Sequence, residues 1–447
     1  MNSERTFYRS RKVVTPEGVR DTHVVVEGET IVGVADTVDV RAGTLVDLGE
    51  AALLPGIVDC HAHVNEPGRT EWEGFTTATQ AAAAGGITTL VDMPLNSIPA
   101  TTSRDALATK AAAAKGQCAV DYGFWGGVVP GNQGELLPMV EAGALGFKAF
   151  LIHSGVDEFP MSRREDLTRA MPLLAQAGVP LLVHAEKTDH EGEPEGDPRR
   201  YQTYLRSRPQ TWEVEAIRMM IDLCREHRCR VHVVHLSAAD ALEDLRRAKE
   251  EGLPFTVETC PHYLSFAAEE IPDGATFFKC APPIREAENR ERLWEAVKSG
   301  LIDLVVSDHS PCTPALKKLE VGDFAHAWGG IAGLQLSVAA VWSGMRARGL
   351  TLDVLAERMA RRPALLAGLS AGKGSIEKGK DADLLIFEPD AMHAVTAEEI
   401  RHRHKVSPYV GKTLHGRVVR TILRGETVFE AGGAERVPTG QRVFARR

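Results

Sequence analysis

An alternation of short apolar runs with longer amphipathic stretches fills the middle of the chain and most constrains its fold. Eight runs of strand length recur at residues 53–63, 88–93, 119–126, 146–152, 180–186, 230–237, 254–262 and 303–311. The stretches between them have a helical pattern, as in 73–85, 164–178 and 238–252, and end in Gly, a usual residue just after a helix. Eight β-α alternations predict an α/β fold, a TIM-like (β/α)8 barrel. A doubly wound open sheet shows the same alternation and stays open as the alternative.

The two ends of the chain have a different, strand-rich pattern. Residues 22–40 alternate valines with polar residues around two glycines, and residues 382–387 and 421–425 are short apolar runs between turn residues. Neither end alone is large enough for a β core, so we expect both to pair into one small β-sandwich. The expected organisation is a sandwich part at 1–55, a catalytic barrel at 56–370 and the remaining sandwich part at 371–447.

Composition narrows the class of protein. The chain has 447 residues, enough for a large barrel with a satellite domain. Its 43% hydrophobic and 25% charged residues are typical of a soluble globular protein, and no apolar run is long enough to predict a transmembrane helix. A net charge of -9 speaks against nucleic-acid binding. The seven scattered cysteines and a polar N-terminus predict reduced thiols in the cytoplasm rather than disulfides or a thiolate zinc site.

Histidines fall where a barrel places its functional residues, at the C-terminal ends of the strands. His61 and His63 end the first run, and residues i and i+2 of a strand point to the same side. Neutral imidazole is a good ligand for zinc and similar ions. His184 and His235 end the fifth and sixth runs. Each histidine alone fits an ordinary surface or core residue, but the four together favour a metal site.

Two further side chains complete the candidate site. Asp308 follows the eighth run, where a carboxylate could bind metal and accept a proton from metal-activated water. His309 is the weaker candidate because its side chain points the opposite way. Lys148 lies inside the fourth run, where an ammonium group is costly to bury. It either reaches the rim of the barrel or, as a neutral amine, reacts with carbon dioxide to a carbamate that bridges two metals.

Residues 187–209 form a charged stretch, broken by Pro and Gly, directly after the fifth run. Such a composition is typical of a solvated surface loop. A long loop at the C-terminal face of a barrel strand is also where an active-site lid would lie. The sequence leaves both interpretations open.

These motifs resemble the cyclic amidohydrolases, the family of dihydroorotases, dihydropyrimidinases (hydantoinases) and allantoinases, over essentially the whole chain. The segments that carry the resemblance are PGIVDCHAH, GFKAF, HAE, HLS, ETCPHYL, APPIR, SDHSP and GSIEKGKDADLLIF. The resemblance implies hydrolysis of a cyclic amide by two divalent metal ions, expected to be zinc, with cobalt, manganese or iron as alternatives. The implied ligands are His61, His63, N6-carboxylated Lys148, His184, His235 and Asp308, and Asp308 would also be the catalytic proton shuttle.

Two positions bear on which ring is opened. Dihydroorotases typically carry an arginine for the substrate carboxylate where this chain has Asn65, and a histidine where it has Cys312. Without these partners the carboxylate of dihydroorotate would have no charged or hydrogen-bonding group to pair with in a desolvated site. The similarity therefore points away from dihydroorotate.

The segments HVNEPGRTEWEGF, DMPLNSIPATT, GFKAFLIHSGVDEFP and AWGGIAGLQ look like those of the allantoinase members of the family. This similarity implies allantoin as the substrate, allantoate as the product, and a pocket lined by Asn96, Cys280, Ser310 and Trp328. A homotetramer with no membrane or nucleic-acid partner is expected. The alternatives are a hydantoinase or dihydropyrimidinase and, from another class, a non-catalytic scaffold on the same fold.

Overall fold

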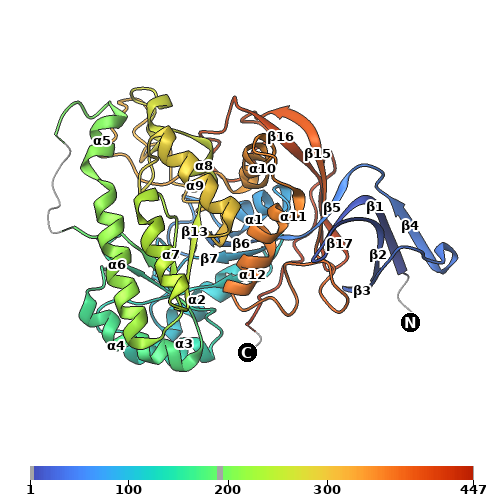
Figure 1. Ribbon diagram of the computed structural model, residues 1–447, viewed down its shortest axis with the longest axis horizontal. Coiled ribbons are helices and arrows are strands. Elements are labelled where there is room, and N and C mark those ends of the chain that lie inside the picture. Colours follow the sequence, from blue (N-terminus) through green and yellow to red (C-terminus); the bar gives the residue numbers. More distant parts are fainter. Residues whose placement is uncertain (1–4, 189–194, 446–447) are drawn as a thin grey trace.

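The computed structural model describes residues 5–188 and 195–445, and its centre is a closed parallel barrel (Figure 1). The strands are β6 (Ile57–Ala62), β7 (Ile87–Asp92), β8 (Asp121–Phe124) continued by β9 (Gly126–Gly127), β10 (Phe147–Phe150), β11 (Leu181–His184), β12 (Val231–Val233), β13 (Phe255–Thr259) and β14 (Leu304–Val305). All of their pairings are parallel. A bridge between Ala62 and His309 joins the first strand to the end of the last. The barrel prediction is confirmed, because an open sheet would leave these edges unpaired.

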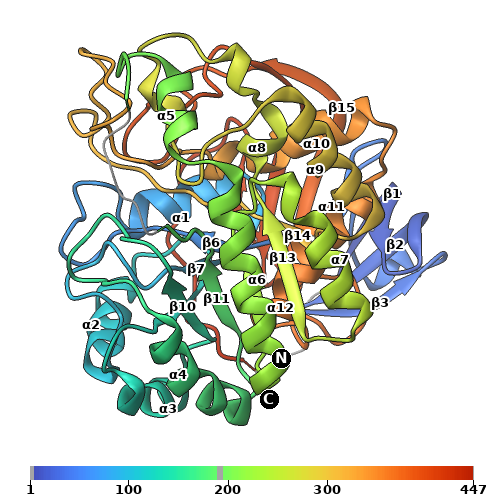
Figure 2. The same ribbon diagram turned by 60° about the vertical axis from the view of Figure 1, so that its left-hand side comes forward.

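The helices follow the strands one by one and cover the outside of the barrel (Figures 1 and 2). They are α1 (Phe75–Ala84), α2 (Arg104–Ala114), α3 (Gln133–Glu141), α4 (Arg164–Ala177), α6 (Gln210–His227), α7 (Leu242–Glu250), α9 (Ala287–Ser299) and α10 (Ser337–Ala347). Three of them match the helical patterns at 73–85, 164–178 and 238–252. The α4 helix ends at Ala177, and the next residue, Gly178, has a φ of 68°, the left-handed conformation that glycine adopts without strain.

Both termini contribute to one mixed sheet beside the barrel, as expected (Figure 1). The first part of the chain provides β1 (Arg5–Thr15), β2 (Gly18–Glu27), β3 (Thr30–Ala35), β4 (Gly43–Asp47) and β5 (Ala52–Pro55), and the last part provides β15 (Leu384–Ala394), β16 (Thr413–Leu423) and β17 (Glu426–Glu430). The two parts meet where β5 pairs antiparallel with β15. Side chains from both parts, including Val24, Leu53, Leu384 and Ile422, form a separate apolar core. The boundaries 1–55, 56–370 and 371–447 remain our proposed division.

A buried ion-pair network joins this sheet to the N-terminal end of the barrel. Lys373 Nζ lies 2.7 Å from carboxylate oxygens of both Asp121, at the start of β8, and Asp383, next to β15. Arg424 also pairs with Asp121. Removing one partner of a buried ion pair lowers the free energy of unfolding by about 3–5 kcal/mol. The network therefore fixes the terminal sheet at the end of the barrel opposite to the candidate site.

The described part of the stretch 187–209 packs over the C-terminal end of the barrel; its residues 189–194 lie outside the described residues. Arg199 donates to the carbonyl of Val321 at 2.6 Å, and the Phe324 N–H donates to the carbonyl of Pro198 at 2.8 Å. The short helix α5 (Tyr201–Ser207) follows. Residues 197–200 are exposed but hydrogen-bonded to the segment around Val321 and Phe324, and much of α5 is buried, so the described part of the stretch is not a free loop. No helix of the described chain is both long and apolar enough to cross a membrane.

Candidate metal centre

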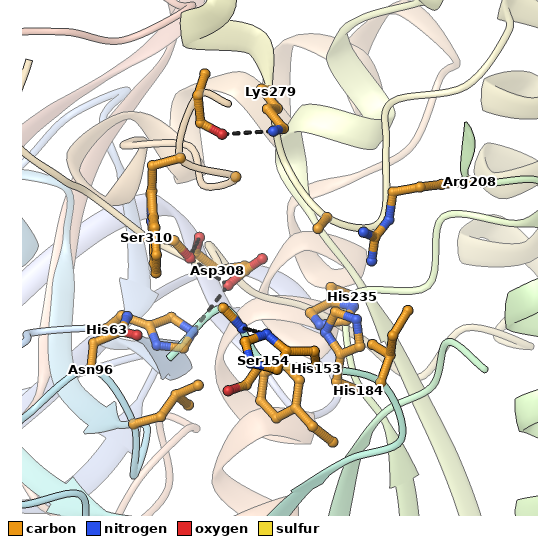
Figure 3. Close-up of a pocket in the computed structure, with 18 of the residues that line it drawn as sticks. His63, Asn96, His153, Ser154, His184, Arg208, His235, Lys279, Asp308 and Ser310 are labelled. Carbon is orange, nitrogen blue, oxygen red and sulfur yellow. Dashed lines mark hydrogen bonds and ion pairs between the residues drawn. The ribbon is translucent and has the colours of Figure 1, made fainter. Parts of the chain in front are cut away.

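Four histidines converge at the C-terminal ends of three barrel strands. The ring centroids of His61 and His63 lie 5.6 Å apart, those of His61 and His235 5.5 Å apart, and those of His184 and His235 4.5 Å apart. Figure 3 shows His184 and His235 side by side and His63 across from them. These short distances show that side chains from β6, β11 and the end of β12 lie around one point, as the sequence predicts.

Asp308 joins the histidines from the end of the eighth strand. Its Oδ1 lies 3.1 Å from His61 Nε2 and 3.5 Å from His63 Nε2, and it also accepts a hydrogen bond from Ser310 Oγ at 2.8 Å. Asp308 and His235 have φ values of 44° and 41°, in a region that non-glycine residues rarely occupy. A strained backbone conformation of this kind is kept only where the surrounding packing and hydrogen bonds stabilise it. Such conformations are frequent at functional sites.

Lys148 is buried among these residues. It is 0% exposed, and its Nζ has no hydrogen-bond partner among the described residues. Nζ lies 5.0 Å from the ring centroid of Phe150, which stacks on His184 at 4.5 Å. Burial lowers the pKa of Lys148 to about 8, so a share of the neutral amine, the form that reacts with carbon dioxide, is present near pH 7. The side chain does not reach the rim of the barrel.

The histidines differ in charge. Burial lowers the pKa values of His63, His184 and His235, which leaves these imidazoles neutral and free to bind metal. For His61, burial acts in the same direction, but the carboxylates of Asp308 and Glu258 raise its pKa to about 9. Burial alone would raise the pKa of Asp308, and the neighbouring histidines hold it well below its usual value. The metal-free site therefore holds an imidazolium beside an ionised carboxylate.

The residues present fit a pair of divalent metal ions. His61, His63 and Asp308 each offer a ligand atom, and these atoms lie within 4.8 Å of one another. On the other side, His235 Nδ1 is buried and, like Lys148 Nζ, finds no hydrogen-bond partner within residues 5–188 and 195–445. Buried polar atoms are nearly always satisfied, so their isolation points to a missing partner. Imidazole and carboxylate groups suit zinc and similar transition metals.

A cavity of ≈ 660 Å³ opens above these residues. Its floor contains His63, Lys148, His184, His235 and Asp308. A family model described as the amidohydrolase family matches residues 52–428 of the chain.

The chain belongs to the amidohydrolase family. The allantoinase of Streptomyces avermitilis is 51% identical over 97% of this chain and 97% of its own, and that of Arabidopsis thaliana is 46% identical over 95% and 88%. The L-hydantoinase (dihydropyrimidinase) of Arthrobacter aurescens has the same fold, with a TM-score of 0.92, 32% identity, and coverage of 99% of this chain and 100% of that one. Membership of the family implies a binuclear metal site and makes the chain a hydrolase of cyclic amides.

Three of the four expected substrate residues of this amidohydrolase line the cavity, and one does not. Asn96, Ser310 and Trp328 line the cavity. Cys280 is buried behind the wall, and its carbonyl accepts a hydrogen bond from Tyr204 Oη at 2.7 Å. Its two neighbours, Lys279 and Ala281, face the cavity instead. Successive side chains of an extended segment point to opposite sides. Residues 279 and 281 therefore face the cavity, and residue 280 between them faces the protein interior.

Two carboxylates that contact proposed metal ligands of this amidohydrolase were not predicted from the sequence. Glu258 contacts Nδ1 of His61 and lies 2.8 Å from Nε2 of His232. Glu186 lies 2.8 Å from Nε2 of His184. A carboxylate on one nitrogen of a ligand histidine fixes its orientation and leaves the other nitrogen for metal. The spacing of His184 and Glu186, two residues apart at the end of a strand, was the available signal for the second pair.

Proposed function

We propose that this amidohydrolase opens the hydantoin ring of allantoin by hydrolysis to give allantoate. The observation that carries the proposal is the convergence of His63, His184, His235 and Asp308 on the floor of one cavity with Lys148, whose Nζ has no hydrogen-bond partner in the described part of the chain. This arrangement supports metal-dependent attack on a ring amide. The choice of allantoin is supported by relatives named allantoinase at 43–51% identity across bacteria, plants and yeast.

The metal ions would be held by the six side chains His61, His63, carboxylated Lys148, His184, His235 and Asp308, and zinc is our first choice of metal. When bound, the two ions would polarise the substrate carbonyl and lower the pKa of water to about 7. Carboxylation needs the neutral Lys148 amine: Nζ attacks carbon dioxide, a C–N bond forms, and one proton leaves. The resulting carbamate is an anion that burial alone would disfavour, so adjacent cations stabilise it.

Asp308 is the residue that moves the proton. Its carboxylate is ionised, so it accepts a proton from the attacking water and delivers that proton to the ring nitrogen that leaves. Ser310 Oγ holds Oδ1 at 2.8 Å, which fixes the direction in which the carboxylate faces. One C–O bond forms and one ring C–N bond breaks, without any covalent bond to the protein.

Dihydroorotate is disfavoured because, once Lys148 is carboxylated, the described residues that line the cavity leave no cationic side chain free for its carboxylate. Asn65 is buried and its side-chain nitrogen donates to the carbonyl of Pro311 at 3.3 Å. Besides Lys148, two cationic side chains, Arg208 and Lys279, line the cavity. Arg208 is paired with Glu186, and Lys279 donates to backbone carbonyls. Hydantoinase activity is the second candidate, since solved structures of hydantoinases match 99% of the chain.

The test is a panel of allantoin, hydantoin, dihydrouracil and dihydroorotate, offered to the purified protein at equal concentration while its metal content is measured. We expect two metal ions per chain and the highest kcat/KM for allantoin. A higher kcat/KM for hydantoin or dihydrouracil would replace the proposal with the second candidate. A protein without metal and without activity on all four would contradict both.

Assembly and location are further parts of the proposal. We propose a homotetramer in the cytoplasm, and light scattering of the purified protein tests the first point. Family membership does not fix the compartment, because the relative from Aquarana catesbeiana is named a mitochondrial allantoinase. Fractionation of the source cells tests the second point.

A further inference from the structure

Two buried lysines lie outside the metal centre and take no part in the proposed chemistry. Lys279 is 8% exposed and Lys317 is 5% exposed. Neither forms an ion pair with a carboxylate in the described part of the chain. Burial lowers the pKa of Lys279 to about 7 and that of Lys317 to about 8. A buried amine of this kind is unfavourable unless other groups compensate its lost hydration.

Backbone carbonyl groups of one segment provide the compensation. Lys279 Nζ donates to the carbonyls of Ala325 at 2.9 Å and Ala327 at 2.6 Å, and Figure 3 shows this lysine at the edge of the cavity. Lys317 Nζ donates to the carbonyls of Trp328 at 2.9 Å, Lys279 at 3.1 Å and Gly330. Four of these five acceptors belong to residues 325–330. The three hydrogens of an ammonium group match the three acceptors around Lys317.

The segment 325–330 is a wall of the cavity and has no helix or strand of its own. Trp328 and Gly329 line the cavity. The Trp328 ring packs edge to face on Trp72 at 4.7 Å, so it also touches the loop after the first strand. A Cβ added at Gly330 would lie 2.3 Å from the carbonyl oxygen of Ser310, so the segment runs directly against the end of the eighth strand.

Without the two lysines, four carbonyl groups of this wall would lose their ammonium donors. The N–H groups of the segment are held separately: those of Ala325 and His326 donate to Asp323 Oδ1, and those of Trp328 and Gly330 donate to the carbonyls of Leu316 and Lys279. Buried carbonyl groups without donors would be unfavourable and would draw the segment towards water. A single ammonium group reaches three carbonyls that diverge in space, which a planar guanidinium does not match.

We infer that Lys279 and Lys317 are positioning residues that fix the segment 325–330 so that Trp328 and Gly329 form a rigid wall of the substrate pocket. The inference rests on the proposed function only for the choice of substrate in its kinetic test. Because neither lysine contacts the metal ligands, their loss should weaken substrate binding and leave the metal chemistry in place. A role in overall stability alone would not change KM in the folded protein.

Lys317→Met is the decisive variant, because Lys317 does not line the cavity and methionine keeps most of its volume. The matched control is Lys318→Met, since Lys318 is the neighbouring lysine and is exposed. We expect the first variant to keep two metals, to raise KM for allantoin by about tenfold and to change kcat by less than about threefold. Amide hydrogen exchange in 325–330 should speed up by about tenfold or more. The control should match the wild type in all four measurements.

An unchanged KM with unchanged exchange in 325–330 would overturn the inference, as would a loss confined to kcat. If Lys317→Met does not fold, Lys279→Met tests the carbonyls of Ala325 and Ala327 by hydrogen exchange alone, because Lys279 itself lines the cavity. The exchange measurement needs no substrate. A wild-type protein inactive on allantoin would therefore overturn the proposed function. The role of the two lysines would still be tested by amide hydrogen exchange in 325–330.

Discussion

Arg208 donates two hydrogen bonds to Glu186, from Nε to Oε1 at 3.0 Å and from Nη2 to Oε2 at 2.5 Å. The same carboxylate lies 2.8 Å from Nε2 of His184. Burial by itself raises the pKa of Glu186, but Arg208 and His184 together hold it well below its usual value. Arg208 belongs to the stretch 187–209, so one end of that stretch is connected through Glu186 to a proposed metal ligand.

Arg208→Lys should weaken metal binding. Lysine keeps the charge but loses the paired geometry of the guanidinium, so Glu186 would hold His184 less firmly. We expect metal affinity to fall by about 10- to 100-fold, measured by competition with a coloured chelator. Arg206→Lys is the control, because Arg206 lies two residues before Arg208, in the last turn of α5, and is exposed. Equal affinities of the two variants would show that Arg208 does not act through His184.

Asp308→Asn should nearly abolish turnover. Asparagine has no basic oxygen for the proton, whereas its size is the same and five of the six proposed metal ligands remain. We expect kcat to fall by about 10²- to 10⁴-fold with most of the metal retained. Activity and metal content are measured on the same sample. A variant with close to wild-type kcat would rule out Asp308 as the proton carrier.

Lys148→Arg should prevent the binuclear centre from forming. Arginine remains protonated at neutral pH and does not form a carbamate, so the bridging anion would be missing. We expect fewer than two metal ions per chain and no carbamate signal after incubation with ¹³C-bicarbonate, whereas the wild type should show the signal by NMR. The exposed Lys115→Arg serves as the control. A full metal complement in Lys148→Arg would contradict carboxylation of this residue.

Metal affinity should rise with pH. The pKa of His61 is raised to about 9, because Asp308 and Glu258 outweigh the opposing effect of burial. Metal must displace that proton, and below about pH 8 carboxylation of Lys148 releases protons as well, so affinity should increase by at least about tenfold per pH unit up to about pH 9 and then level off. His63, with a pKa lowered by burial, is already neutral at pH 7 and releases none.

Chelator competition at about pH 6.5, 7.5 and 8.5 measures this slope. Glu258→Gln removes one of the two carboxylates that raise the pKa of His61, so the levelling point of that variant should move to lower pH. A flat profile in the wild type would show that His61 carries no proton in the metal-free protein.

The barrel was predictable because strand and helix patterns are local. Each apolar run is bounded by polar or turn residues, and its period is set by neighbouring side chains. The terminal sheet was predictable in outline, since neither end could form a core alone. Its details were not: β17 was not foreseen, and the central pairing of β5 with β15 joins segments more than half the chain apart.

The candidate ligands follow the same rule. His61, His63, His184, His235 and Asp308 stand at the ends of their runs, and parallel strands in one barrel bring such ends together. The pocket wall follows no such pattern. The sequence assigned Cys280 to the wall, but the direction of each side chain in 279–281 depends on how an irregular loop packs.

The sequence by itself therefore determined the barrel, the proposed ligands and their place at one end of it, because these depend on residue type and short-range periodicity. The tertiary structure alone decided which groups support them. His61 and Glu258 are 197 residues apart, and Lys317 reaches its carbonyl partners across two irregular segments. Such contacts arise only when the complete chain has packed, since no local pattern links their positions.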